Sequence, residues 1–191
     1  LRIIARSKKG SKPNGLFSPA AIDTDNNGTI DRIYAGDNQG NLWAFDFSAA
    51  NDSSWSLSYN SSPLFSGNLD QSITVEPIII RHPHLNTGLN PNVLILFGTG
   101  RFLSEADKTL SGTQSFYAVW DAGRSDLDRD NLIAQKFLVN NSAGGRVTES
   151  DLEITYGSIS NRKYGWYLDL PSEGERVIST ALVRDNIVYF N

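Results

Sequence analysis

The sequence predicts a mainly all-β fold, a β-propeller or part of one, with one short inserted helix. Short runs rich in Val, Ile, Phe, Tyr and Trp alternate with Gly, Asn, Ser and Asp, which is typical of many short strands joined by turns. Several of these runs are continuously apolar, as expected for strands that are covered on both faces. A loose repeat in how the strands end favours stacked blades.

The expected strands follow one another along the whole chain, each bounded by turn residues. In chain order they cover 16–22, 32–36, 41–47, 73–81, 93–98, 114–120, 164–170, 176–184 and 187–190. Three aromatic and apolar segments close on aspartate, at Asp46, Asp121 and Asp169. Periodic aromatic marks are typical of propeller blades, because stacking buries the large rings. The spacing is uneven, so the repeat alone supports the propeller only weakly. We interpret the rings as core rather than as a ligand platform.

The segment 126–138 departs from the β pattern. Its apolar residues recur at helical spacing from Leu132 to Phe137, and Ser125 with Asp128 forms a capping-box pattern. We therefore expect a short helix between blades. The aspartates at 126, 128 and 130 also suggest a second calcium loop, but that loop would lack its glycine and would have Ala134 at the closing position. Acidic residues at a helix start explain them better.

Length and composition limit the possible classes of function. The 191 residues suit one domain, or part of one, over 1–191. Lys and Arg total 17 against 21 Asp and Glu, so nucleic acid is not an expected partner. The absence of cysteine excludes thiolate sites and disulfides and leaves the redox compartment open. No apolar run approaches the roughly 20 residues that span a bilayer, so no membrane insertion is expected.

The chain ends suggest a piece of a longer protein. A strand-like run with Leu1, Ile3 and Ile4 opens the sequence, and Asn191 follows directly on the apolar run 187–190. Both ends therefore look cut from something longer.

One segment carries recognisable chemistry, the loop 23–31. It follows the pattern Asp-x-Asp-x-Asn-Gly-x-x-Asp, in which side chains at the first, third and fifth positions converge on one centre and glycine permits the sharp turn. The expected ligands are Asp23, Asp25, Asn27, the backbone carbonyl of Thr29, and Asp31. Carboxylate and amide oxygens without imidazole or thiolate select Ca²⁺. Three carboxylates in one shell also repel each other unless a cation lies between them.

The flanks of this loop distinguish it from an EF-hand and leave one alternative. Tyr34 occupies the twelfth position, where an EF-hand carries a bidentate Glu, and both flanks are strand-like. We therefore expect a calcium loop that joins two strands of a hairpin. The alternative is a plain turn on Asn27 and Gly28. That turn explains two residues and leaves three correctly spaced aspartates to chance.

The region around the loop resembles a known family. The segments 16–23 and 32–46, on either side of the loop, look like the hallmark of PilC/PilY proteins of type IV pili. Further matches follow in the family's order, at 96–103, 114–121, 165–170 and 174–177. The resemblance implies a quinoprotein-like propeller at the C-terminal end of a large extracytoplasmic protein, at the pilus tip, outer membrane or cell surface of a Gram-negative bacterium.

The resemblance also implies a role and partners. The family promotes pilus assembly by opposing retraction and supports twitching motility and adhesion, and its calcium loop controls pilus extension and retraction. Expected partners are pilus minor subunits or the assembly machinery, and a host-cell receptor through other domains. Two departures matter: no adhesive N-terminal region is present, and the nearest string to an Arg-Gly-Asp signal is Arg124-Ser125-Asp126.

Two other functions compete with this interpretation. Propellers with recurring Trp also resemble quinone-dependent dehydrogenases, but those gather calcium ligands from separate blades, whereas here the ligands lie in one hairpin. The only histidines, His82 and His84, lie in a polar loop without a carboxylate near them in sequence, so we expect exposed side chains without a catalytic role. The second alternative is a generic calcium-stabilised adhesion or scaffold propeller, whose repeats usually carry the loop in several blades.

Overall fold

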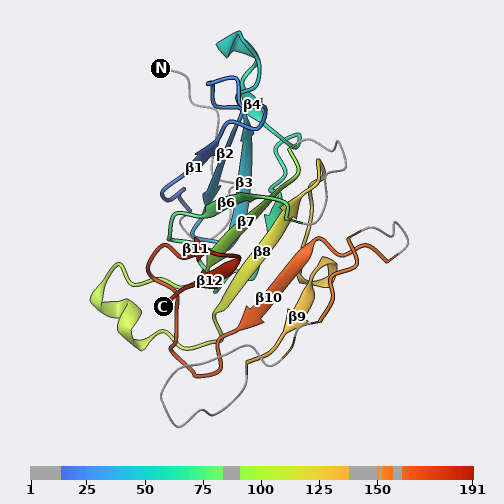
Figure 1. The fold of residues 1–191 in the computed structure, drawn as a ribbon. Helices are drawn as coiled ribbons and strands as arrows, with labels where there is room; N and C mark the ends of the chain where they lie inside the picture. Colours follow the sequence, from blue (N-terminus) through green and yellow to red (C-terminus); the bar gives the residue numbers. More distant parts are fainter. Residues whose placement is uncertain (1–13, 84–90, 138–149, 151, 157–160) are drawn as a thin grey trace.

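The fold consists of short strands connected by turns and single turns of 3₁₀ helix (Figure 1). The computed structural model describes residues 14–83, 91–137, 150, 152–156 and 161–191. The strands are β1 (Ala20–Ile22), β2 (Arg32–Gly36), β3 (Asn41–Asp46), β4 (Ser56–Leu57), β5 (Phe65–Ser66), β6 (Ile78–Arg81), β7 (Val93–Gly98), β8 (Ser115–Asp121), β9 (Ile133–Gln135), β10 (Gly165–Asp169), β11 (Leu182–Arg184) and β12 (Ile187–Tyr189). The 3₁₀ turns are η1 (Asp52–Ser54), η2 (Glu105–Thr109) and η3 (Arg129–Asn131). The predicted all-β class is confirmed.

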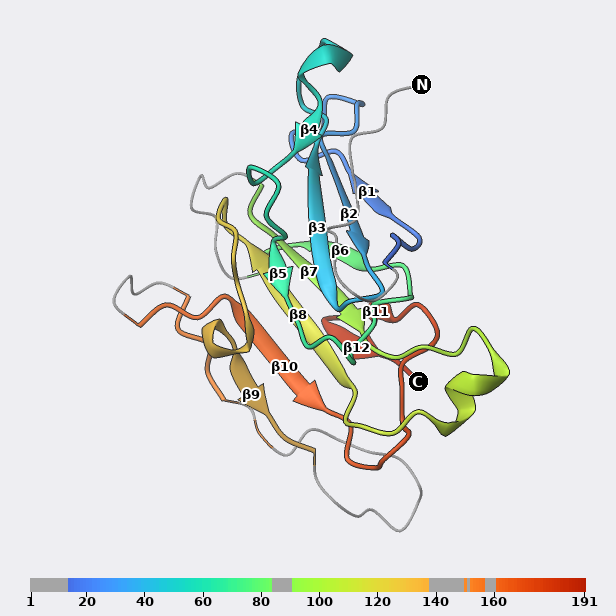
Figure 2. The same cartoon turned by 180° about the vertical axis from the view of Figure 1, so that it is seen from behind.

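Two five-stranded sheets and one hairpin make up the described strands. The first sheet has the order β1-β2-β3-β4, and β5 also pairs with β3. The second sheet has the order β6-β7-β8-β10-β9, in which β9 is parallel to β10 and the other neighbours are antiparallel. The two-stranded sheet β11-β12 completes the set. Figure 2 shows β5 beside β3, close to the second sheet.

The second sheet is covered on both faces, which explains why every residue of β7 and β8 is buried. Successive side chains of a strand point to opposite faces. Tyr117 packs against Phe65 of the first sheet, with ring centroids 5.1 Å apart. Its neighbour Phe116 stacks on Phe190, just after β12, at 4.2 Å. The order of layers is therefore first sheet, second sheet, hairpin, as in stacked propeller blades.

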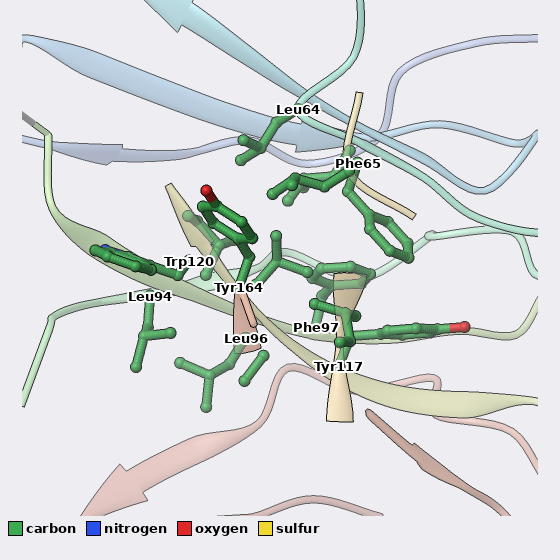
Figure 3. Packing of buried hydrophobic residues seen from close by; sticks show 14 of the residues in the cluster. Leu64, Phe65, Leu94, Leu96, Phe97, Tyr117, Trp120 and Tyr164 are labelled. Atoms are coloured by element: carbon green, nitrogen blue, oxygen red, sulfur yellow. The ribbon is translucent and has the colours of Figure 1, made fainter. Parts of the chain in front are cut away.

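One hydrophobic core joins the two large sheets. Leu64 and Phe65 enter it from the first sheet's side and meet Phe97, Tyr117 and Trp120 of the second (Figure 3). Burial of such aromatic side chains contributes about 1.5–3 kcal/mol each. A polar contact crosses the same interface, because the Tyr34 hydroxyl donates a hydrogen bond of 2.8 Å to the buried Asp121 carboxylate.

The helix expected over 126–138 is wrong. Asp126 has a φ of 58°, η3 contributes one 3₁₀ turn, and β9 follows at once and pairs with β10. Pairing with an existing sheet edge therefore overrode the helical spacing of the apolar residues. A capping box is present but lies three residues further along the chain: Asp128, instead of Ser125, is the N-cap, and its partner is Asn131. Leu138 lies outside the described residues.

Two of the strand predictions match the observed bounds without change. The bounds predicted for 32–36 and 93–98 are those observed. The stretches 16–22 and 73–81 form paired strands only after Pro19 and Pro77, where β1 and β6 begin, because proline lacks the N–H that a strand ladder needs. The run at residues 1–4 lies outside the described residues.

The three segments that end on aspartate do not each belong to a separate blade. The strands β8 and β10, which end on two of these aspartates, are antiparallel neighbours in the same sheet. The repeat therefore does not support the propeller, whereas the stacking of the sheets agrees with it.

Candidate metal centre

The loop 23–31 connects β1 to β2, the hairpin that the sequence predicted. Ile22 and Arg32 are opposite each other in the antiparallel register, and the N–H of Asp31 donates to the carbonyl of Ile22 at 3.0 Å. The N–H of Phe47, just after β3, donates to the carbonyl of Asp31 at 2.7 Å. The closing residue is therefore fixed by two strands of the first sheet.

Three carboxylates converge within this loop. Oxygen atoms of Asp23, Asp25 and Asp31 all lie within 4.8 Å of one another. Asp31 is buried with 5% of its surface exposed, Asp23 is half-buried and Asp25 is exposed. The cluster is thus buried at Asp31 and open to solvent at Asp25. Hard oxygen ligands at this spacing are what a divalent cation such as Ca²⁺ requires.

Backbone N–H groups hold the first carboxylate in place. Oδ1 of Asp23 accepts from the N–H of Asn26 at 2.6 Å and of Asn27 at 3.2 Å, and Oδ2 accepts from the N–H of Gly28 at 2.7 Å. Gly28 has a φ of 91°, a conformation that favours glycine. Desolvation raises the pKa of Asp23, but these three hydrogen bonds outweigh it and lower the pKa below its ordinary value. The carboxylate is therefore kept ionised, as a cation ligand must be.

The other side chains of the loop are oriented by its own backbone. Oδ2 of Asp31 accepts from the N–H and the hydroxyl of Thr24, at 2.7 and 2.6 Å. Oδ1 of Asp25 accepts from the N–H of Asn27 at 3.0 Å. Oδ1 of Asn27 accepts from the N–H of Thr29 at 2.8 Å. The structure brings the three aspartates together, while the ligand roles of Asn27 and of the Thr29 carbonyl stay predictions.

Comparison with known proteins places this fold in a family. The family model for the PilY1 beta-propeller domain matches residues 2–156. The chain belongs to the PilY1 β-propeller family. The resemblance to PilC/PilY proteins is therefore confirmed, and the β-propeller expected from it is the fold of this family.

Individual members of this family also match the chain over most of its length. The chain is 32% identical over 200 residues to the type IV pilus biogenesis factor PilY1 of Pseudomonas aeruginosa. This alignment covers 85% of the chain and 17% of the Pseudomonas protein. The chain is also 30% identical over 195 residues to a PilY1 homologue of Xylella fastidiosa, over 93% of the chain and 13% of the homologue. The chain therefore spans less than a fifth of the length of these relatives.

A solved structure agrees with the sequence relatives. The crystal structure of the Pseudomonas aeruginosa PilY1 C-terminal domain superimposes with a TM-score of 0.76 at 29% identity, over 95% of this chain and 44% of that one. The resemblance to the C-terminal region of PilC/PilY proteins is confirmed. Among the described residues, no helix is long and apolar enough to cross a membrane.

No sequence pattern indicated one residue that contacts the candidate site, Arg81. This last residue of β6 lies in the second sheet, yet its guanidinium donates to the carbonyls of Thr24 at 2.9 Å and Asp23 at 3.3 Å. It also donates to Oδ1 of Asn26 at 2.9 Å. Because 55 to 58 positions separate these partners, no local pattern could have indicated the contact.

The expectation of an exposed His82 is wrong. The residue is buried, with its ring edge-on to Tyr156 at a centroid distance of 4.3 Å and tilted against Trp120 at 5.1 Å. Packing against these two aromatic rings is the physical reason, because an imidazole ring buries well against other rings. His84 lies outside the described residues.

Proposed function

We propose that this chain is a calcium-binding propeller region of a type IV pilus protein, located outside the cytoplasm at the pilus tip, outer membrane or cell surface. In this role calcium in the loop regulates pilus extension and retraction, and through them twitching motility and adhesion. The observation that carries the proposal is the convergence of three carboxylates in one hairpin of a PilY1-family chain.

The donor set favours calcium over other ions. Asp23, Asp25 and Asp31 supply carboxylate oxygens, Asn27 an amide oxygen and Thr29 a backbone carbonyl, a set without nitrogen or sulfur. Such sets suit Ca²⁺ and Mg²⁺, and the larger ion tolerates the irregular geometry of a nine-residue loop better. Ionised carboxylates that lie this close together repel one another, so a bound cation stabilises the arrangement.

The proposed partners follow from the relatives' role in pilus biogenesis. Pilus minor subunits or the assembly machinery are the partners that such a factor requires, and a host-cell receptor would be reached through other domains. The relatives are described as biogenesis factors rather than enzymes, and we propose no catalytic activity for this chain.

The test is a calorimetric calcium titration of the intact protein with Mg²⁺ as competitor. We expect calcium to bind in the range of about 10⁻⁴ to 10⁻³ M that is usual for extracellular sites, and Mg²⁺ to compete poorly. Asp31→Asn keeps the shape of the buried ligand and removes its charge, so it should abolish binding. Asp130→Asn, which changes an aspartate of the rejected second loop, is the matched control and should bind as the parent does.

Regulation is tested separately from binding. Asp31→Asn, placed in the intact protein in cells, should change surface piliation and twitching, with Asp130→Asn as control. If calcium binds but piliation and twitching stay unchanged across calcium concentrations, the ion only stiffens a hairpin and the scaffold alternative is correct.

A further inference from the structure

Arg81 links the two large sheets at the metal loop. The residue ends β6 at the edge of the second sheet, and β1, which leads into the loop, lies against β6. Figure 1 shows the β1-β2 hairpin next to β6. The guanidinium thus reaches from one sheet into the candidate site of the other, through the three hydrogen bonds given above.

The choice of acceptors leaves the metal ligands available. Arg81 donates to two backbone carbonyls and to the amide oxygen of Asn26, and the loop's three carboxylates do not serve as its acceptors. Asn26, with a φ of 62°, is held from both sides, because its N–H donates to Asp23 and its side chain accepts from Arg81. The Arg81 guanidinium therefore stabilises the first half of the loop, where Asn26 has a positive φ, without neutralising the three carboxylates.

We propose that Arg81 is a positioning residue that couples ion binding in the loop 23–31 to the edge of the second sheet at β6. The inference rests on the proposed calcium function and extends it to regulation of the same site. Arg81 favours the loop conformation in which the carboxylates converge, and calcium favours that same conformation. By linkage, calcium then tightens the contact between the loop and β6 as much as Arg81 tightens calcium binding.

Two effects of Arg81 on calcium oppose each other and can be separated. Its hydrogen bonds preorganise the loop, whereas its positive charge repels the cation. Lysine keeps the charge but cannot reproduce a planar fork that bridges several acceptors. Glutamine removes both the charge and the fork. Arg81→Lys should therefore weaken calcium binding more than Arg81→Gln does.

The first measurement is calcium affinity by calorimetry in the intact protein. We expect about a tenfold loss for Arg81→Lys, equivalent to about 1.4 kcal/mol, and a smaller loss for Arg81→Gln. Arg184→Gln, which removes an exposed arginine of β11, is the matched control and should leave affinity unchanged. Parent-like affinity in Arg81→Lys overturns the inference.

The second measurement is hydrogen exchange with and without calcium. In the parent, calcium should slow exchange in the loop and in the amides of β6. In Arg81→Lys, saturating calcium should still protect the loop, but it should protect β6 no more than β8, whose amides report the stability gained by the whole molecule. Calcium protection of β6 that still exceeds that of β8 in Arg81→Lys overturns the coupling and leaves the calcium site intact. A parent that neither binds calcium nor protects the loop overturns the proposed function itself, and the inference with it.

Discussion

Asp121 is a buried carboxylate at the end of β8 that joins the two large sheets. Its oxygens accept hydrogen bonds from the hydroxyls of Tyr34 and Tyr59 and from the N–H of Gly123. Burial raises the pKa of Asp121, and these donors, with Arg32 nearby, only partly offset the rise. The same burial raises the pKa of Tyr34 well above its ordinary value, so this phenol stays a donor.

The raised pKa of Asp121 gives a pH dependence of defined sign. The folded state binds the proton more tightly than the unfolded state, so the contribution of Asp121 to stability is full below the ordinary carboxyl pKa of 3.8. It is lost as pH rises through the raised pKa of the folded state. The stability of the parent minus that of Asp121→Asn should therefore fall as pH rises through this window and then level off. The fall is about 1.4 kcal/mol for each unit of pKa shift.

Urea unfolding of the intact protein at several pH values checks this prediction. Asp185→Asn, which changes an aspartate whose side chain is 86% exposed, is the control and should follow the parent at every pH. A parent-minus-variant difference that rises with pH would contradict the assigned direction of the shift.

At the level of residues, sequence predicted what is local and missed what is distant. The spacing of Asp23, Asp25 and Asp31 lies within nine positions, so their convergence could be inferred from the pattern alone. The contacts of Arg81 with the loop, and of Tyr34 with Asp121 across 87 positions, depend on how the sheets pack. No spacing rule carries that information.

The end of β7 illustrates how an element depends on a chain segment packed on it. A Cβ atom at Gly98 would lie 2.2 Å from the Cβ of Val177. Val177 is held there because its N–H donates to the carbonyl of Thr99 at 2.9 Å. The glycine therefore permits the segment around 177 to lie directly on the strand.

Gly98→Ala should destabilise the protein by about 1–3 kcal/mol or more, because the contact cannot relax without moving the backbone of one partner. Chemical denaturation with both variants measures the difference. Gly15→Ala is the control, since a Cβ there meets nothing within 4 Å, and it should change stability little. Equal stability of the two variants would show that the segment around 177 does not pack on β7 as described.

At the level of elements, continuous apolar runs such as β7 were predicted with their bounds, because burial on both faces leaves a clear signature. The two-residue strands β4 and β5 were missed. They form because β3 offers a free edge, and so few residues carry no periodic signal. The segment of β9 was assigned to a helix for a different reason, because its apolar residues have helical spacing and only its pairing with β10 makes it a strand.

At the level of the whole molecule, the layered order of sheets was predictable as a class but not in its connections. Aromatic-rich strands indicate large rings buried between blades, and Phe65, Phe97 and Tyr117 do form such a contact. Which strands share a sheet depends on pairing over long sequence distances. The strands β8 and β10, which both end on aspartate, are neighbours in one sheet and do not belong to separate blades. Because both sheets share one core, we expect them to unfold together.

A shared core means that calcium in the first sheet should stabilise the second sheet too. Ligand binding to the folded state adds RT ln(1 + [L]/Kd), about 2.7 kcal/mol at a hundredfold excess over Kd. Scanning calorimetry of the intact protein should therefore show a single transition for the two sheets that shifts upward with calcium, and Asp31→Asn should remove the shift. Two separate transitions, of which calcium moves only one, would mean that the sheets unfold independently. In that case the contacts of Tyr34 and Arg81 across the interface would be too weak to couple them.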